Sequence, residues 1–133
     1  MIQNNVNAIA LVGRILIALL FVISGFGKIA GFAGVAGYIG SKGLPMPQVL
    51  AALTIALELG GGILLIAGYK VRWVAIAFFL WLIPTTFLFH AFWSVPAAEM
   101  QNQMNNFLKN VSIMGAMLYL AAFGPGAFSV EKK

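Results

Sequence analysis

The chain has 133 residues, of which 62% are hydrophobic and only 8% are charged, and it contains no cysteine. Soluble domains hold about 45–50% apolar and about 25% charged residues, so the composition excludes an ordinary soluble protein and indicates a membrane protein. The lack of cysteine excludes disulfides, thiolate metal sites and cysteine-bound iron–sulfur clusters within the chain. The net charge of +5 comes from scattered lysines and arginines, which indicates membrane topology and contact with anionic lipid rather than nucleic-acid binding.

Four apolar stretches are long enough for the ~20 residues that a membrane-spanning helix needs. They cover residues 8–30, 48–69, 71–93 and 105–123. The sequence therefore predicts an all-α fold, a transmembrane four-helix bundle that forms one domain over residues 1–133. A cleaved signal peptide is the alternative for the first stretch, but the letters MIQNN lack the basic start of such a peptide and Arg14 falls within its apolar part. We expect this stretch to be retained as a helix.

A glycine-rich segment, GFAGVAGYIGSKGLPMPQ at residues 31–48, separates the first two stretches. Its five glycines and two prolines disfavour regular helix, so we expect a short interfacial segment followed by a turn. Pro84 lies inside the third stretch, where a kink is tolerated if neighbours pair the freed carbonyl. The polar letters QNQMNN at residues 101–106 lead into the fourth stretch and are typical of a membrane interface.

The basic residues set the expected orientation in the membrane. Lys70 and Arg72 lie in the short turn between the second and third stretches, and the last two residues are lysines. Positive residues are enriched on the cytoplasmic side, so we expect this turn and both the N- and C-termini to be cytoplasmic. Lys28 and Lys42 then fall on the outer side, against the same rule.

Ionisable side chains are rare inside the apolar stretches, and Glu58 stands near the middle of the second one. A charge at that depth costs roughly 2.5–3.5 kcal/mol on insertion scales, and a carboxylate is too short to reach water from there. We therefore expect an intramembrane ion pair inside the bundle, with Lys109 or Arg14 as the cation and with either a structural or a catalytic role. Arg14 has a second interpretation, because its long side chain also reaches the cytoplasmic interface.

A second group of polar side chains lies toward the outer ends of the helices, by depth at 1.5 Å per residue. We expect the group to converge on one outer cavity that binds a ligand, with His90 as a proton relay because histidine exchanges protons near neutral pH. The alternatives are an interfacial lysine and a histidine that bonds only to backbone. One histidine and one deep carboxylate do not make a metal site. The group consists of Lys28, His90, Lys109 and Asn110.

Five strings of the sequence carry these polar positions. They are RILIALLFVISGFGKIAGF (14–32), GLPMP (43–47), ALELGGGILLIAGYKVR (56–72), TTFLFHAFW (85–93) and NFLKNVSIMGAMLYLAAFGPGA (106–127). Together they resemble the DoxX family of small four-helix membrane proteins. The recurring polar and glycine positions of that family fall here on Arg14, Ser24, Gly25, Lys28, Glu58, Gly61, Gly62, Phe89, His90, Lys109 and Asn110.

The resemblance implies a multi-pass protein of the bacterial inner membrane. Better-studied members include a subunit of a thiosulfate:quinone oxidoreductase and a component of a membrane-associated oxidoreductase complex, which implies quinone-linked redox work with quinone as the ligand. This chain has no redox-active residue of its own, so the resemblance does not imply an independent enzyme.

Two functions fit these residues. The first is an accessory subunit of a quinone-linked redox system, which binds quinone or a similar small hydrophobic ligand in an outward-facing polar pocket with His90, Lys109 and Asn110 as donors. The second is a non-enzymatic membrane carrier or an assembly (scaffold) protein, in which the ion pair of Glu58 fixes helix packing. Besides the lipid bilayer, the sequence is compatible with a soluble or membrane oxidoreductase partner and with a homo-oligomer.

Overall fold

The computed structural model of the protein describes residues 2–131, and helices account for nearly all of this part of the chain, which contains no strand. In chain order the elements are α1 (Ile2–Ala30), α2 (Phe32–Ser41), α3 (Pro47–Ile55), the π-helical segment η1 (Ala56–Gly61), α4 (Gly62–Ala67), α5 (Val71–Phe89), the 3₁₀ turn η2 (Phe92–Ser94) and α6 (Ala97–Phe123). The segments α3, η1 and α4 follow one another without a break and form one helical rod.

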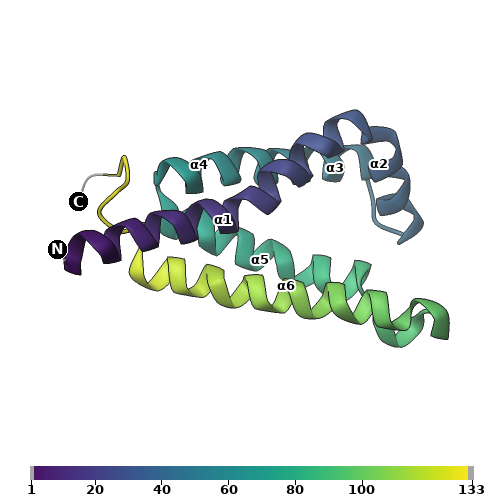
Figure 1. Cartoon of the computed structure of the whole chain (residues 1–133). Helices are drawn as coiled ribbons and strands as arrows, with labels where there is room; N and C mark the ends of the chain where they lie inside the picture. Colours follow the sequence, from purple (N-terminus) through teal and green to yellow (C-terminus); the bar gives the residue numbers. More distant parts are fainter. Residues whose placement is uncertain (1, 132–133) are drawn as a thin grey trace.

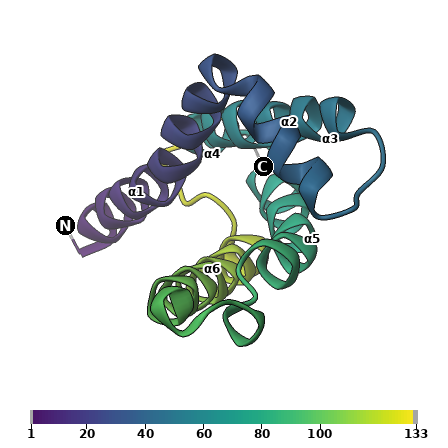
Figure 2. The ribbon, with the colours of Figure 1, turned by 90° about the vertical axis from the view of Figure 1, so that its right-hand side faces the viewer.

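The long helices lie side by side as two antiparallel pairs (Figure 1). α1 packs along the rod of α3, η1 and α4, whereas α5 packs along α6. Seen along the helices in Figure 2, α1, α4, α5 and α6 surround a common centre. α2 and α3 pack on each other at the end where α1 finishes.

The main core lies where these helices meet. Its aromatic centre is formed by Phe21 of α1 and Phe78 of α5, whose ring centroids are 4.3 Å apart, and the ring of Trp81 meets both in edge contacts. Gly62 allows α1 and α4 to approach closely, because a Cβ at this position would lie 2.7 Å from the side chain of Val22. Small residues at helix contacts are a common device in membrane proteins.

Within residues 2–131, three helical segments are long and apolar enough to cross a membrane. They are Asn5–Ala30, Pro47–Ala67 and Val71–Ser94. The predicted all-helical class is confirmed, but the predicted count of four spans is not. α6 is 27 residues long, yet its first half is polar and it also carries Lys109 and Asn110, so its hydropathy falls below that of the other three.

The glycine-rich segment contains a regular helix where the sequence predicted none. α2 covers ten residues, and its buried Ala36 and Ile39 pack with Ala51 of α3. Each internal glycine disfavours helix by about 1 kcal/mol relative to alanine, and this tertiary packing overrides that preference. The turn falls after α2, where Gly43 and Met46 have positive φ angles of 78° and 49°.

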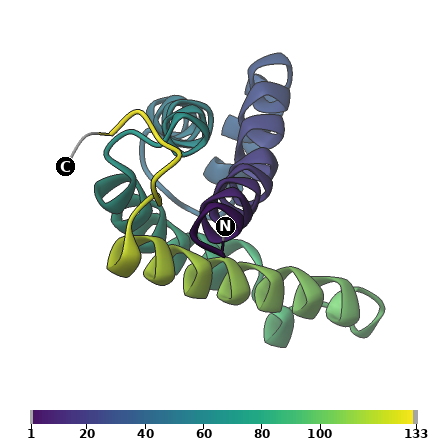
Figure 3. The same cartoon turned by 60° about the vertical axis from the view of Figure 1, so that its left-hand side comes forward.

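The tail after α6 folds back over the turn between α4 and α5 (Figure 3). The backbone N–H groups of Val130 and Glu131 donate to the carbonyls of Ala67 and Gly68 at 3.0 and 3.1 Å. Gly68 has a φ of 81°, and a Cβ there would lie 2.4 Å from Ser129, so this close crossing requires glycine. The start of α1, the α4–α5 turn and the tail therefore lie at one end of the molecule (Figure 1).

Candidate functional site

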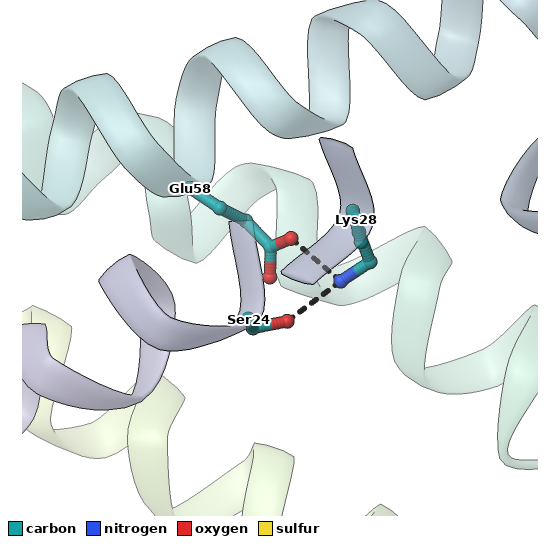
Figure 4. Close-up of polar contacts among 3 residues, drawn as sticks. All are labelled: Ser24, Lys28 and Glu58. Atoms are coloured by element: carbon teal, nitrogen blue, oxygen red, sulfur yellow. Dashed lines mark hydrogen bonds and ion pairs between the residues drawn. The ribbon is translucent and has the colours of Figure 1, made fainter. Parts of the chain in front are cut away.

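Glu58 and Lys28 form an ion pair between η1 and α1 (Figure 4). The Nζ of Lys28 lies 2.6 Å from Oε1 of Glu58 and also donates to Oγ of Ser24 at 2.7 Å. Ser24 and Lys28 are four residues apart on α1, so they share one helix face. The Glu58 side chain is only 5% exposed, whereas that of Lys28 is 28% exposed. The carboxylate is therefore enclosed, and its cation faces partly outward.

The backbone around Glu58 is wound as a π-helix over Ala56–Gly61. Such turns are rare and occur frequently at functional sites. α1 approaches this segment at Gly25, where a Cβ would lie 2.9 Å from the backbone nitrogen of Leu59 and 3.1 Å from Cβ of Glu58. The missing side chain of Gly25 thus lets η1 come near enough for Glu58 to reach Lys28.

The cation that pairs with Glu58 is neither of the two that the sequence suggested. Arg14 is buried near the middle of α1, about four turns before Lys28, and its guanidinium donates to the carbonyls of Ile66, Pro125 and Phe128. Its guanidinium therefore does not pair with Glu58 and instead ties the tail to α1 and α4. Lys109 is exposed on α6. Depth along the helices suggested these partners, but α1 is the helix that packs on η1, while α6 packs on α5.

A cavity of about 680 Å³ lies between the end of α1, α2, α3 and the C-terminal half of α5. Its volume is within the ~300–1,000 Å³ that is typical of ligand sites, and its walls, like theirs, are mostly apolar. Two of its polar side chains are already bonded to backbone: Thr85 donates to the carbonyl of Trp81 at 2.8 Å, and Tyr38 donates to that of Phe89 at 3.4 Å. Residues that line the cavity include Lys28, Gly34, Tyr38, Trp81, Pro84, Thr85, Phe89 and His90.

His90 follows the last residue of α5, and its ring links the cavity wall to α6. Nδ1 lies 2.9 Å from Oε1 of Gln103. An amide oxygen only accepts hydrogen bonds, so in this arrangement Nδ1 carries the proton, and Nε2 carries the lone pair when the ring is neutral.

Of the four residues predicted to share an outer cavity, the structure brings Lys28 and His90 to its wall and leaves Lys109 and Asn110 outside it. Asn110 is buried on α6. α6 packs on another face of α5, where Phe87 meets Phe107 with ring centroids 5.4 Å apart. The helix pairing therefore separates residues that lie at similar depths.

Sequence reasoning missed the wall that α2 contributes. Its cavity-lining residues recur at spacings of three and four, which is the signal of one helix face. The expectation that glycine breaks the helix concealed this signal. These residues are Gly34, Val35, Tyr38 and Ile39, together with Gly31 directly before α2. Gln103, the partner of His90, was also missed, because only the packing of α5 on α6 brings the two side chains together.

The described part of the chain has three helices apolar enough to span a membrane and a carboxylate paired between helices. These features define an integral membrane protein whose helices contact the lipid bilayer. It belongs to the DoxX family, whose family model matches residues 9–91, and the resemblance noted in the sequence is thereby confirmed.

Two Escherichia coli (strain K12) proteins are similar over most of their length. The chain is 38% identical to inner membrane protein YphA over 123 residues and 39% identical to inner membrane protein YqjF over 122 residues, in both cases 92% of this chain and 88% of the relative. It is also 35% identical over 72 residues to the Surfeit locus protein 4 homolog of Schizosaccharomyces pombe, which is 53% of this chain and 24% of that protein. No solved structure matches the chain.

Proposed function

We propose that the protein is an accessory subunit of a quinone-linked redox system in the inner membrane, and that it binds quinone or a similar small hydrophobic ligand in the cavity beside α2. The names of its two Escherichia coli relatives support the inner-membrane location. The observation that carries the proposal is the cavity of about 680 Å³, whose apolar walls are interrupted by Lys28 and His90.

The chemistry of these walls suits a quinone head group. Its carbonyl oxygens accept hydrogen bonds, and Lys28 is a donor on the wall. The rings of Tyr38, Trp81 and Phe89 line the same space and provide flat apolar surfaces for a ring to pack on. His90 is the proton relay for quinone reduction in this proposal, because a neutral imidazole carries both a proton donor and a proton acceptor on its ring. Lys109 and Asn110 have no place in this donor set.

The chain has no cysteine, and its other side chains do not carry out electron transfer of the kind that redox cofactors supply. Electrons for quinone reduction therefore come from a partner oxidoreductase in this proposal, which is why the role is that of an accessory subunit. In this proposal Lys28 orients the ligand and His90 exchanges its protons.

Binding can be measured through Trp81, because it lines the cavity whereas Trp73 and Trp93 do not. In a variant with Trp73→Phe and Trp93→Phe, the fluorescence of Trp81 reports what enters the cavity, since quinones quench indole emission on contact. We expect decylubiquinone to quench this emission saturably when the protein is held in lipid nanodiscs.

Two glycines of α2 provide a matched pair of variants. A Cβ added at Gly34 or at Gly37 would meet no neighbouring atom within 4 Å, so a side chain can start at either position without a clash, but only Gly34 lines the cavity. Gly34→Leu is expected to weaken quinone binding by at least about tenfold, or about 1.4 kcal/mol, while Gly37→Leu leaves it unchanged. No saturable quenching, or equal affinity in the two variants, would count against the proposal and favour the assembly or scaffold alternative.

A further inference from the structure

We infer that the cavity selects ligands with a neutral, hydrogen-bond-accepting head over ligands with an anionic head, and that Glu58 sets this preference through Lys28. The inference rests on the proposed binding function of the cavity and specifies the chemical class of its ligand.

The first step concerns charge. Lys28 is the cationic residue on the cavity wall, and no carboxylate lines the cavity within residues 2–131. A lone lysine in an apolar cavity would attract a carboxylate ligand. Here the charge of Lys28 is balanced by Glu58, with Nζ and Oε1 only 2.6 Å apart. An incoming anion would also meet the negative charge of Glu58 in surroundings of low dielectric constant, where like charges repel strongly.

The second step concerns hydrogen bonds. An ammonium group has three N–H donors and no acceptor. Two of those of Lys28 are taken by Ser24 and Glu58, which leaves one donor on a side chain that lines the cavity. One donor satisfies the oxygen of a ketone, quinone or ester carbonyl, and the ligand needs no charge of its own.

The third step concerns which partner the ligand meets. Glu58 is 5% exposed and does not line the cavity, while Lys28 is 28% exposed and does. A ligand therefore contacts the lysine, with the carboxylate behind it. Glu58 is a positioning residue in this arrangement: it neutralises the charge of Lys28 and directs its remaining donor. Such a bias against the wrong ligand class is a usual source of specificity.

The test compares two probes with the same brominated chain and different heads, a brominated stearic acid and its methyl ester, at about pH 8, where an aliphatic carboxylic acid is mostly ionised. Bromine quenches tryptophan on contact, so Trp81 again reports occupancy in nanodiscs. The Gly34→Leu variant supplies the baseline for probe that is dissolved only in the lipid. We expect the wild-type cavity to bind the ester at least about tenfold more tightly than the acid, or about 1.4 kcal/mol.

Glu58→Gln should then increase acid binding by about tenfold or more, because the charge of Lys28 becomes uncompensated, a change of about 1.4 kcal/mol per tenfold. The double variant Lys28→Gln with Glu58→Gln should lose this gain. Glu99→Gln is the matched control, since Glu99 is an exposed carboxylate in the first turn of α6. A role of Glu58 in packing alone would weaken both probes together and leave their ratio unchanged.

The inference is overturned if the wild type binds the acid as tightly as the ester, or if folded Glu58→Gln keeps the wild-type ratio. Should Glu58→Gln fail to fold, the wild-type ratio still decides. Failure of decylubiquinone to bind, with the ester preference intact, refutes the quinone proposal and leaves this inference standing. Failure of the wild type to bind any probe refutes both.

Discussion

The contact between α1 and η1 at Gly25 makes the position of Glu58 open to a direct test. An added methyl group at Gly25 would lie 2.9 Å from the backbone nitrogen of Leu59 and 3.1 Å from Cβ of Glu58. A backbone atom cannot move aside as a flexible side chain does, so Gly25→Ala should push α1 and η1 apart. Gly27 lies two residues further along α1, and a Cβ there would meet nothing within 4 Å.

The pair Gly25→Ala and Gly27→Ala isolates the cost of this clash. Both substitutions occur inside α1, so both gain the helix preference of alanine over glycine, about 1 kcal/mol, and this gain cancels in the comparison. Forcing an extra methyl group into a packed contact typically costs about 1–3 kcal/mol. We therefore expect Gly25→Ala to be less stable than Gly27→Ala by about 1–3 kcal/mol.

The stability of each variant is measured by reversible unfolding of the purified protein in mixed micelles with increasing denaturing detergent. A parallel titration of decylubiquinone shows whether the shift at Gly25 also disturbs the cavity wall at Lys28. Equal free energies of unfolding for the two variants would refute the close approach of α1 and η1. A more stable Gly25→Ala protein would refute it as well.

Two further predictions follow from the contacts, and a third follows from the distribution of basic residues. Glu58→Gln leaves the partly exposed cation of Lys28 without its counterion, so it should destabilise the protein by about 3 kcal/mol, the low end of the range for buried pairs; unchanged detergent unfolding would contradict this. Arg14→Lys keeps the charge but cannot reach three carbonyls at once, so the tail at residues 124–131 should become sensitive to protease, and wild-type resistance would argue against the tether. The chain has no cysteine, so Lys70→Cys and Ser41→Cys can each be labelled in intact cells with a membrane-impermeant thiol reagent. We expect labelling at position 41 and none at position 70. The reverse pattern would show the opposite orientation in the membrane.

The residues of the candidate site were only partly predictable from sequence. Depth and electrostatic cost single out Glu58, Lys28 and His90 without a structure, because charged and polar groups inside a membrane need a partner. The same reasoning assigned Glu58 to Lys109 or Arg14. Depth is a position along one helix, and it carries no information about which helix packs on which or which face each side chain occupies.

The prediction for α2 was wrong for a related reason. Local preference disfavours helix in a segment with glycine at every third position, and local preference was all that the sequence offered there. The burial of Ala36 and Ile39 against α3 supplies a tertiary contribution that local preference does not contain. Because this segment was not expected to form a regular helix, no helix face could be assigned to it. Tyr38 and the rest of that cavity wall were therefore missed.

The amino-acid sequence alone determined that this is an all-helical membrane protein. A chain that is 62% hydrophobic must place apolar segments in lipid, and there each backbone group must be paired within its own helix. The sequence also determined which charged and polar side chains would have a high free energy in lipid without a partner. Tertiary structure alone decided that Glu58 pairs with Lys28, that Arg14 holds the tail, and that His90 shares a cavity with α2. Those contacts depend on which helices lie side by side, and this is decided by the packing of whole helix faces, to which every residue of a face contributes.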